Sequence, residues 1–372
     1  MAKIISIVLA ALVAVSCFSV SAFAVTDDVS QAAAESGYDK NQTSIAVSGN
    51  VTYNELDTYE DYLNKNADIP DGQDNVVINA SNLVEELGGV KVDNGEKYPS
   101  ENGENYKKVV YTGETGTAQF KFTLKKAGKY NVVLKYHTVT GKDINIVREL
   151  KINGVTPFSN AAECTFTRNF VDVLTKDKDG KEGFKKDYLG NELRPDQKEV
   201  LGWKSQYFYD YLGFYTDPLE FAFQKGDNTI TLESVKEPVV IGSIELVPIK
   251  DVQSYDTYIK QYDGAKKYEG DEKFIEGEAA TLKSDKTLYP SADVSTASTS
   301  TYGEKTSAYT QSVNMIGGTN WQYMQQAITW TVGDDVKEGL YSLNFKYRQN
   351  TNDGMRSPRK LYINGEIPFA EA

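Results

Sequence analysis

The sequence predicts an all-β protein made of two tandem β-sandwich domains, with a short helical segment before each and the second sandwich incomplete. Three observations lead to this prediction. Short runs with a polar–apolar period of two recur along the chain and are separated by Gly, Asp and Asn. A stretch of the first half returns in the second half, which indicates duplicated domains. Similar tyrosine-containing segments of helical character precede the two halves.

The first 24 residues have the features of a secretory signal peptide. Lys3 gives a positive start, residues 4–15 are almost continuously apolar, and Ala22-Phe23-Ala24 matches an A-x-A cleavage site. Such a segment is too short for a stable transmembrane helix, so we expect a secreted protein, extracellular or attached to the cell surface. Lipidation at Cys17 is the alternative that these residues leave open.

After the signal peptide we expect a polar linker over residues 25–74, with a short helix near residues 59–63, and then a first sandwich over residues 75–250. The alternation typical of strands is clearest at residues 118–124, 130–136, 219–223, 229–232 and 239–247. Residues 177–197 are charged and punctuated by Gly, so we expect a long loop there. Its start, residues 177–182, is similar to an EF-hand loop, but a solvated loop is the prediction.

The internal repeat aligns residues 127–161 with residues 338–372 without gaps. Identical positions include Tyr130 and Tyr341, Lys135-Tyr136 and Lys346-Tyr347, Arg148 and Arg359, Pro157-Phe158 and Pro368-Phe369, and Ile152-Asn153-Gly154 and Ile363-Asn364-Gly365. Because Asn-Gly tolerates positive φ at both central positions of a turn, each repeat should contain a tight hairpin there. The period of about 200 residues is far longer than that of a solenoid, so these are tandem domains.

The second unit should begin with a helical linker over residues 251–270 and continue as a sandwich over residues 271–372. Residues 339–347 alternate in the pattern G-x-Y-x-L-x-F-x-Y, which predicts a strand. In the first unit about ninety residues with several strands follow Pro157-Phe158, whereas the given sequence has three residues after Pro368-Phe369. We therefore expect the second sandwich to be incomplete and the sequence to be a fragment of a longer protein.

Several of these motifs resemble known families. The E-x-E-x-A opening at Glu276–Ala280, the 339–347 run and the I-N-G hairpin resemble carbohydrate-binding modules of families 6 and 35, which are galactose-binding-like jelly-roll sandwiches. More closely, Tyr289-Pro290-Ser291-Ala292-Asp293, Ile316-Gly317-Gly318, Trp321 and the closing N-G-E-I-P-F resemble tandem N-terminal modules of large extracellular solute-binding proteins of carbohydrate ABC transporters. The resemblance covers nearly all of the chain after the signal peptide. It implies a solute-binding domain beyond Ala372 and, through it, a transporter permease as partner.

Charge and composition exclude some function classes. The formal net charge of −13 and the lack of a basic stripe argue against nucleic-acid binding. The single histidine, His137, lies in a strand-like run, and no Gly-x-Ser-x-Gly elbow is present, so we expect no enzyme. Cys164 lies in an alternating run, and a buried apolar role is its default interpretation.

Aromatic residues in loops and strips are the candidates for sugar binding, because a ring can pack on the C–H groups of a pyranose. Trp203 and Tyr207 belong to an aromatic strip after the long loop, and one face of that strip could instead be core. Trp321 and Tyr323 follow Gly317-Gly318 near an expected sandwich edge. Trp330 is in phase with Ile328 and Val332 and is predicted to be core.

Glu276 and Glu278 are the candidate metal ligands. On a strand, residues i and i+2 point to one side, so both carboxylates could face one cation, and oxygen ligands suit Ca²⁺. The family resemblance implies a structural calcium held by this pair in the second domain. The alternative is two solvated acids on an edge strand. The first unit has Asn79 and Ser81 at the aligned positions, which makes calcium doubtful there.

The sequence thus predicts a non-catalytic carbohydrate-binding region at the cell surface, with an oligo- or polysaccharide as ligand, as part of a solute-binding protein of a sugar ABC transporter. Two alternatives stay open. The domains could be structural spacers that pack against a downstream domain, or accessory modules of a glycoside hydrolase. The residues do not name the sugar.

Overall fold

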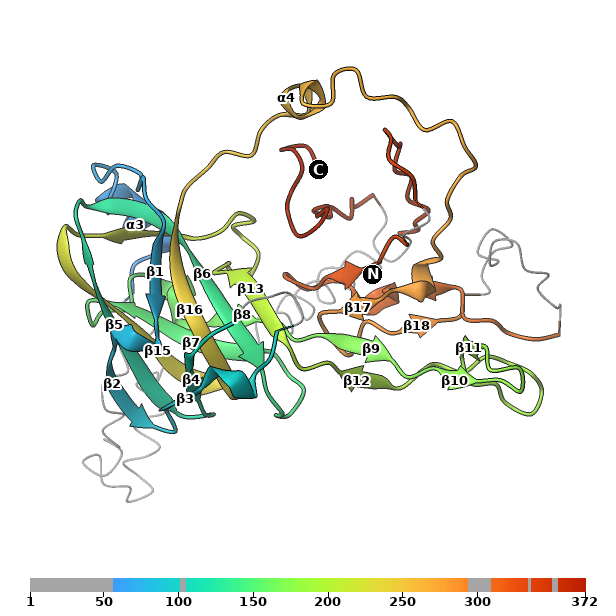
Figure 1. Ribbon diagram of the computed structural model, residues 1–372, viewed down its shortest axis with the longest axis horizontal. Helices are drawn as coiled ribbons and strands as arrows, with labels where there is room; N and C mark the ends of the chain where they lie inside the picture. Colours follow the sequence, from blue (N-terminus) through green and yellow to red (C-terminus); the bar gives the residue numbers. More distant parts are fainter. Residues whose placement is uncertain (1–55, 101–104, 294–308, 334–335, 350–353) are drawn as a thin grey trace, which may run out of the picture. The chain divides into compact units, whose positions relative to one another are not determined.

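The computed structural model describes residues 56–100, 105–293, 309–333, 336–349 and 354–372 (Figure 1). The predicted signal peptide, Cys17 and most of the predicted 25–74 linker lie outside the described residues. The fold class is all-β with a few short helices, as the sequence predicts. Among the described residues, the helices are too short or too polar to cross a membrane.

The first repeat is a sandwich of two antiparallel sheets. The larger sheet runs in the order β13 (Trp203–Tyr207), β6 (Gly128–Thr138), β16 (Val239–Pro248), β4 (Lys108–Thr112) and β3 (Lys91–Asn94), while β1 (Val76–Asn79) pairs with β16 and β14 (Glu220–Phe223) pairs with β6. The smaller sheet runs in the order β2 (Leu83–Gly88), β5 (Gly116–Leu124), β15 (Gly226–Lys236), β7 (Ile146–Ile152) and β8 (Cys164–Phe166).

The core lies between these sheets and follows the period of two in the sequence. On β6, alternate side chains face the smaller sheet and are at most 5% exposed; these are Tyr130, Val132, Leu134 and Tyr136. The facing residues of β5 are Ala118, Phe120, Phe122 and Leu124, at most 6% exposed. Because successive strand residues point to opposite sides, the odd-numbered residues of β6 face outward. Cys164 is fully buried, and burial raises the pKa of its thiol, so the predicted apolar role is confirmed.

Two short helices occupy the positions that the repeated tyrosines predict. Helix α3 (Tyr59–Lys65) begins at Thr58, whose hydroxyl accepts a hydrogen bond from the Asp61 amide at 3.1 Å. Helix α4 (Tyr255–Lys260) lies at the start of the second unit. In the part of the chain that the structure describes, the 3₁₀ turns are η2 (Ala80–Asn82), η3 (Gly95–Lys97), η4 (Ser159–Ala162), η5 (Gly277–Ala279) and η7 (Gly318–Asn320).

Both predicted Asn-Gly hairpins are present. Asn153 and Gly154 have φ values of 51° and 84°, and Asn364 and Gly365 have 53° and 86°. Positive φ at two successive residues matches the twist of the flanking strands, and Asn and Gly are the residues that adopt it at least cost.

The predicted loop at residues 177–197 is part of an extended arm. The arm contains β9 (Phe170–Asp172), β10 (Thr175–Lys176), β11 (Glu182–Gly183) and β12 (Gln197–Glu199). Residues 177–181 form the turn of the β10–β11 hairpin, where the Asp177 carboxylate accepts the amides of Asp179 and Lys181 at 2.9 Å each. The similarity to an EF-hand therefore reflects a turn whose acid caps backbone N–H groups.

The arm joins a sheet with the second unit. The order of this sheet is β12, β9, β17 (Leu282–Lys283) and β20 (Ile328–Thr329). Lys283 on β17 and Asp172 on β9 form an ion pair whose side chains are 0% and 7% exposed. The other sheet of the second unit pairs β18 (Pro290–Ser291) with β19 (Met315–Ile316).

The predicted strand at residues 339–347 is wrong for this structure. The segment is not a strand, and the side chains that should face a core are exposed: Tyr341 47%, Leu343 61%, Phe345 62% and Tyr347 82%. Its counterpart β6 is held by β13, β14 and β16, and the described residues of the second unit supply no such partners. Trp330, predicted to be core, is only partly buried; of the run around it only β20 (Ile328–Thr329) is a strand, and Val332 is 53% exposed.

A partly buried lysine gives the first repeat a pH-dependent stability. Lys204 on β13 donates to the Arg168 carbonyl at 3.1 Å and to Asn169 Oδ1 at 2.5 Å, and burial lowers its pKa to about 7. Since an unfolded lysine has a pKa of about 10.4, the unfolded chain binds a proton between about pH 7 and pH 10 that the folded chain does not. The contribution of Lys204 to stability therefore rises with pH across this window.

We expect urea denaturation to show this dependence against the Lys204→Met variant. The stability of the wild type relative to the variant should increase from pH 7 to pH 9, by at most about tenfold in the folding equilibrium constant per pH unit. Lys121→Met is the control, because the Lys121 side chain is 50% exposed. A difference between wild type and Lys204→Met that stays constant over this range would contradict the expectation.

Candidate functional site

The outer face of the seven-stranded sheet carries the predicted residues Trp203 and Tyr207. Trp203 is opposite His137 and Tyr207 is opposite Val133 in the pairing of β13 with β6. Directly opposed residues share a face, and His137 and Val133 are outward-facing positions of β6. Both aromatic side chains are partly exposed.

The Trp203 ring is held in an aromatic cluster. Its centroid lies 4.6 Å from the Tyr106 ring and 5.4 Å from the His137 ring. The indole N–H donates to the Tyr98 carbonyl at 2.7 Å. Burial lowers the pKa of His137, so its imidazole is neutral near pH 7, as suits a ring packed among aromatics. His137 thus has a packing role, in line with the sequence interpretation.

A β-bulge at Gly242 shapes this face. The register of β16 against β6 shifts between Ile241 and Ser243, so one extra residue stands opposite β6. Ile241 faces the core, and without the bulge Ser243 would face it too. A Cβ at Gly242 would lie 2.6 Å from the Tyr106 ring and 2.7 Å from the Trp203 ring, so only glycine fits beneath the cluster.

The bulge turns Ser243 and Glu245 to the side of the sheet that carries the rings, where Ser243 is covered and only 1% exposed. The Ser243 hydroxyl lies 3.5 Å from the Tyr106 hydroxyl and donates to Glu245 Oε1 at 3.3 Å. Lys135 Nζ is 3.2 Å from the same carboxylate oxygen, and the two side chains are 24% and 23% exposed. In this register Glu245 and Tyr207 both lie opposite Val133, on opposite sides of β6. We call this set, Tyr106, Lys135, Trp203, Tyr207, Ser243 and Glu245, the aromatic–polar face.

Trp321 and Tyr323 lie in a separate turn of the second unit. The Trp321 indole N–H donates to the Gln326 carbonyl at 3.2 Å, and the Arg359 guanidinium lies 4.4 Å above its ring. One face of Trp321 is therefore covered by a cation. Tyr323 is 68% exposed. A hydrogen bond of 2.9 Å from Gln206 to Gln325 joins this turn to β13.

Glu276 and Glu278 do not lie on a strand, so the predicted geometry is wrong. Residues 277–279 form the 3₁₀ turn η5, in which residues i and i+2 do not share a face as they do on a strand. Glu278 is 7% exposed. Within the described residues no group of three or more His, Cys, Asp or Glu side chains could hold a metal ion. Two carboxylates alone are fewer than the roughly six to eight oxygens of a calcium site, so calcium here stays a prediction.

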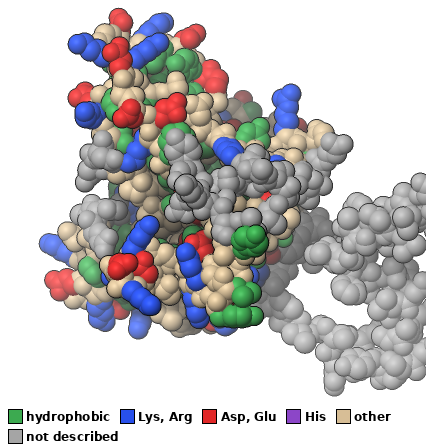
Figure 2. Space-filling view, turned by 90° about the vertical axis from the view of Figure 1, so that its right-hand side faces the viewer, with side chains coloured by type: hydrophobic (Ala, Val, Ile, Leu, Met, Phe, Trp, Pro, Cys, Tyr) green, Lys and Arg blue, Asp and Glu red, His purple; other side chains and the backbone are tan. Residues whose placement is uncertain are grey.

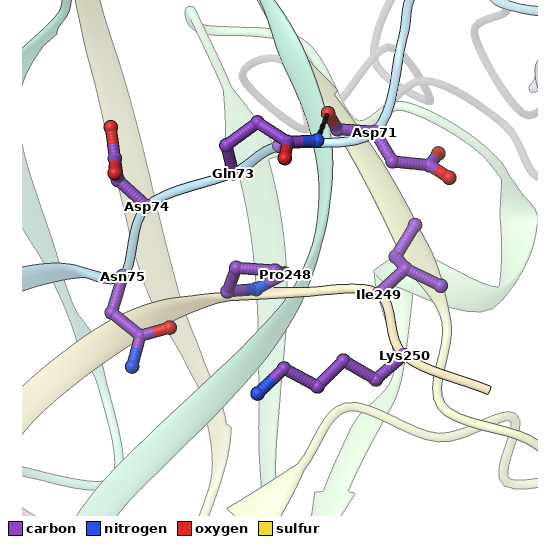
Figure 3. Close-up of a pocket in the computed structure, with 8 residues that line it drawn as sticks. Asp71, Gln73, Asp74, Asn75, Pro248, Ile249 and Lys250 are labelled. Atoms are coloured by element: carbon purple, nitrogen blue, oxygen red, sulfur yellow. Dashed lines mark hydrogen bonds between the residues drawn. The ribbon is translucent and has the colours of Figure 1, made fainter. Parts of the chain in front are cut away.

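A hollow of about 580 Å³ lies where the first sandwich begins and ends (Figure 3). Its lining comes from residues 71–75 before β1 and residues 248–250 after β16. Gln73 donates to the Asp71 carbonyl at 3.1 Å, and Lys250 extends from the other segment in the close-up. The lining contains no aromatic ring, so a sugar could not stack there as it could on the aromatic–polar face.

Charges on the surface are mixed in sign. Figure 2 shows acidic and basic side chains interspersed over the face it presents, rather than one basic field. This distribution agrees with the acidic net charge of −13, which does not favour nucleic acid.

Sequence reasoning missed three parts of this site. The apolar run at residues 239–247 was predicted as one regular strand, although a glycine such as Gly242 within a strand pattern is a known signal of a bulge. Glu245 and Lys135 are separated by 110 positions and meet only through strand pairing. Tyr106 comes from a loop with no regular pattern.

No family model matches the chain, and no curated protein matches it. Solved structures similar to it include a family 35 carbohydrate-binding module from Clostridium thermocellum, at 10% identity and a TM-score of 0.27, covering 46% of this chain and 97% of that one. A CBM35 from Cellvibrio japonicus Abf62 has 11% identity and a TM-score of 0.26, covering 47% and 93%. The Podospora anserina GH26-CBM35 β-(1,4)-mannanase has 14% identity and a TM-score of 0.26, covering 50% of this chain and 33% of that one. Similarity at this level identifies neither a ligand nor an activity for this chain.

Proposed function

We propose that this chain is a non-catalytic carbohydrate-binding region and that the aromatic–polar face of the first repeat holds the sugar. The observation that carries the proposal is the bulge at Gly242, which turns Ser243 and Glu245 outward onto the face that holds Trp203 and Tyr207. Flat rings pack on the C–H faces of a pyranose, and the adjacent, partly exposed carboxylate of Glu245 and ammonium of Lys135 can bond to its hydroxyls. Nothing in this chemistry requires a nucleophile or a general base.

The preformed geometry of the face supports binding without large rearrangement. Trp203 is fixed by its indole hydrogen bond of 2.7 Å to the Tyr98 carbonyl and by tilted packing against the Tyr106 ring, at an interplanar angle of 36°. Glu245 is oriented by Ser243 and Lys135 at 3.3 and 3.2 Å. Rigid side chains lose little conformational entropy when a ligand binds, which favours affinity.

Calorimetric titration of the full chain with a panel of neutral and acidic oligosaccharides tests the proposal. We expect saturable binding to at least one sugar. Trp203→Ala should abolish it and Glu245→Gln should weaken it by about tenfold, since a charge-assisted hydrogen bond contributes about 1.5–3 kcal/mol. Glu245→Gln keeps the side-chain shape, so its effect does not depend on refolding of the site.

The control variant is Tyr188→Ala. Tyr188 is 94% exposed and lies in the arm, so its loss should leave binding unchanged. Thermal unfolding of each variant shows whether the sandwich is intact. If the folded wild-type chain binds no sugar of the panel, the carbohydrate proposal is wrong.

The wider context is a separate part of the proposal and rests on sequence resemblance alone. In it, the chain is secreted or attached to the cell surface and works beside a solute-binding domain of a sugar ABC transporter. Reading the gene downstream of the codon for Ala372 tests this context. A two-lobed solute-binding domain would support it, and a glycosidase domain would favour the accessory-module alternative.

A spacer role is the second candidate, and one observation favours it. The arm of the first repeat shares the sheet β12-β9-β17-β20 with the second unit, and a buried ion pair between Asp172 and Lys283 joins them. Such a junction suits two modules that keep a fixed relation rather than two independent binders.

A further inference from the structure

Three aromatic side chains lie in a line along β13 and the residues that follow it. Trp203, Tyr207 and Tyr209 are separated by even numbers of residues, so on an extended chain they point to one side. Phe208, between the two tyrosines, is 1% exposed and packs on the core residue Phe221, which fixes the opposite side for its neighbours. All three rings therefore lie on the outer side of the sheet, where each side chain is partly exposed.

The spacing of these rings exceeds the size of one sugar. The ring centroids of Tyr207 and Tyr209 are 6.3 Å apart. Trp203 precedes Tyr207 by four residues, which is about 13 Å along a strand that rises about 3.3 Å per residue. A pyranose is about as large as a phenol ring, so one sugar cannot pack on both Trp203 and Tyr207. A ligand that uses both rings needs a further sugar between them.

Polar side chains occupy the interval between the two rings. Ser205 is exposed and lies opposite Lys135 in the pairing of β13 with β6. Lys135 Nζ is 3.2 Å from Glu245 Oε1, and these two side chains are 24% and 23% exposed. A sugar held between the rings would meet a hydroxyl and an ammonium–carboxylate pair, which are groups that bond to sugar hydroxyls.

The row across the strands from Trp203 is covered. Beside Trp203 lie His137 of β6 and then Val240 of β16, which are 8% and 0% exposed. The Tyr98 ring lies 5.4 Å from the His137 ring, and the Tyr98 carbonyl accepts the indole N–H of Trp203. A ligand that starts on Trp203 therefore extends along β13, toward Tyr207, rather than across the sheet.

The charges along this line disfavour an anionic ligand. Lys135 is paired with Glu245. Burial raises the pKa of the Tyr207 phenol, and the carboxylates of Glu366 and Glu245 raise it further, so two acids and one cation surround this part of the face. The chain as a whole has a net charge of −13. A sugar that carries a carboxylate would be repelled here.

We propose that the aromatic–polar face binds a linear, uncharged oligo- or polysaccharide through at least three consecutive sugar residues that run along β13. This inference rests on the proposed carbohydrate-binding function and names the class of ligand. Sugars at the two ends pack on Trp203 and Tyr207, and Tyr209 extends the platform beyond Tyr207. The sugar between them bonds to Lys135 and Glu245.

The probes are malto-, cello-, manno- and xylo-oligosaccharides of one to six residues, titrated into the full chain by calorimetry. For a series that binds, the association constant should rise at least about tenfold from one to three residues, because the third sugar reaches the second ring. Trigalacturonic acid should bind at least about tenfold more weakly than the neutral trisaccharide, because its carboxylates are repelled. The wild-type chain alone gives both results, so neither depends on the folding of a variant.

Two tyrosine variants locate the ligand on the sheet. Tyr207→Ala should remove the rise in affinity from one to three residues, because the second ring is lost. Tyr111→Ala is the matched control and should bind every probe like the wild type. Tyr111 lies on the same side of the sheet but on β4, with Lys91 Nζ 5.0 Å above its ring. Thermal unfolding shows whether each variant is folded.

The outcomes separate this inference from the proposed function. Equal affinity for the monosaccharide and the hexasaccharide would overturn the inference and leave sugar binding in place. A loss of binding in Tyr111→Ala without one in Tyr207→Ala would do the same, as would tighter binding of trigalacturonic acid than of any neutral probe. A folded chain that binds none of these probes would contradict both the inference and the proposed function.

Discussion

Replacing Arg168 with alanine is expected to destabilise the first repeat by about 3–5 kcal/mol, because it would leave a buried carboxylate without its cation. The Arg168 side chain is fully buried and bonds Glu237 Oε2 at 2.7 Å and Glu199 Oε1 at 2.5 Å. The Glu237 side chain is 1% exposed. Urea denaturation followed by tryptophan fluorescence measures the change in the free energy of unfolding.

The surroundings of Arg168 explain why no other group can replace it. Its Nε and Nη1 atoms also donate to the carbonyls of Ile144 and Val139 at 2.7 and 2.8 Å. Glu237 has a φ of 64°, in the left-handed region, and its carboxylate accepts the Lys142 amide at 2.8 Å. Arg168 thus bonds both to the loop that contains Val139 and Ile144 and to the strained residue Glu237.

Two further variants make this prediction specific. Adding Glu237→Gln to Arg168→Ala should recover part of the loss, since the uncompensated charge is then removed. Lys142→Ala is the control beside the network, where the exposed pair with Glu114 should contribute less than about 1 kcal/mol. A loss below about 1 kcal/mol in Arg168→Ala would show that the buried network does not stabilise the fold.

Phe158→Ala should cost about 3–5 kcal/mol, whereas the same change at its repeat counterpart Phe369 should cost far less. Phe158 is fully buried among Tyr59, Tyr62 and Phe221, so its removal leaves a cavity lined by these three rings. Phe369 is only partly buried and contacts the two tyrosines of α4. Because Phe158 and Phe369 occupy the same motif with similar ring contacts, comparing their two alanine variants measures how the loss of stability depends on burial of the ring.

The measurement is again urea denaturation of the full chain, with far-ultraviolet circular dichroism as a second probe. Phe158→Leu serves as the milder change and should cost less than Phe158→Ala, because it leaves a smaller cavity. Equal losses for Phe158→Ala and Phe369→Ala would mean that Phe369 is as deeply buried in solution as Phe158.

Local patterns in the sequence predicted the parts of the fold that depend on neighbouring residues. The repeated tyrosines marked both short helices, and Asn153-Gly154 marked a hairpin whose φ values are as expected. The alternation of β6 correctly identified the residues that face the smaller sheet, although outward-facing Asn131, Val133 and His137 are also at most 9% exposed. In each case the physical cause lies within a few residues of the chain. It is a helix cap, a tight turn or the alternation of the two faces of a strand.

The failures have a common cause in contacts between distant residues. Residues 339–347 have the alternation of a strand, yet a strand needs partners to bond, and the described part of the second unit offers none. Glu276 and Glu278 matched a strand pattern, but the chain forms a 3₁₀ turn there, as it does at the aligned residues 80–82. The role of Trp203 as a ligand contact stays a prediction, and its hydrogen bond to Tyr98, 105 positions away, could not be foreseen from the aromatic strip.

The pairing of β9 with β17 also has a consequence for the order of events during synthesis. Strand β17 begins at Leu282, about 110 residues after β9 ends at Asp172. At about 5–20 residues per second, the ribosome adds those residues in roughly 5 to 20 s. During that interval the first sandwich can close, while the edge of β9 that later meets β17 stays open to any other strand nearby. The nascent chain is therefore most prone to mispairing after its first domain has folded, and rapid synthesis of residues 173–283 would shorten the time at risk.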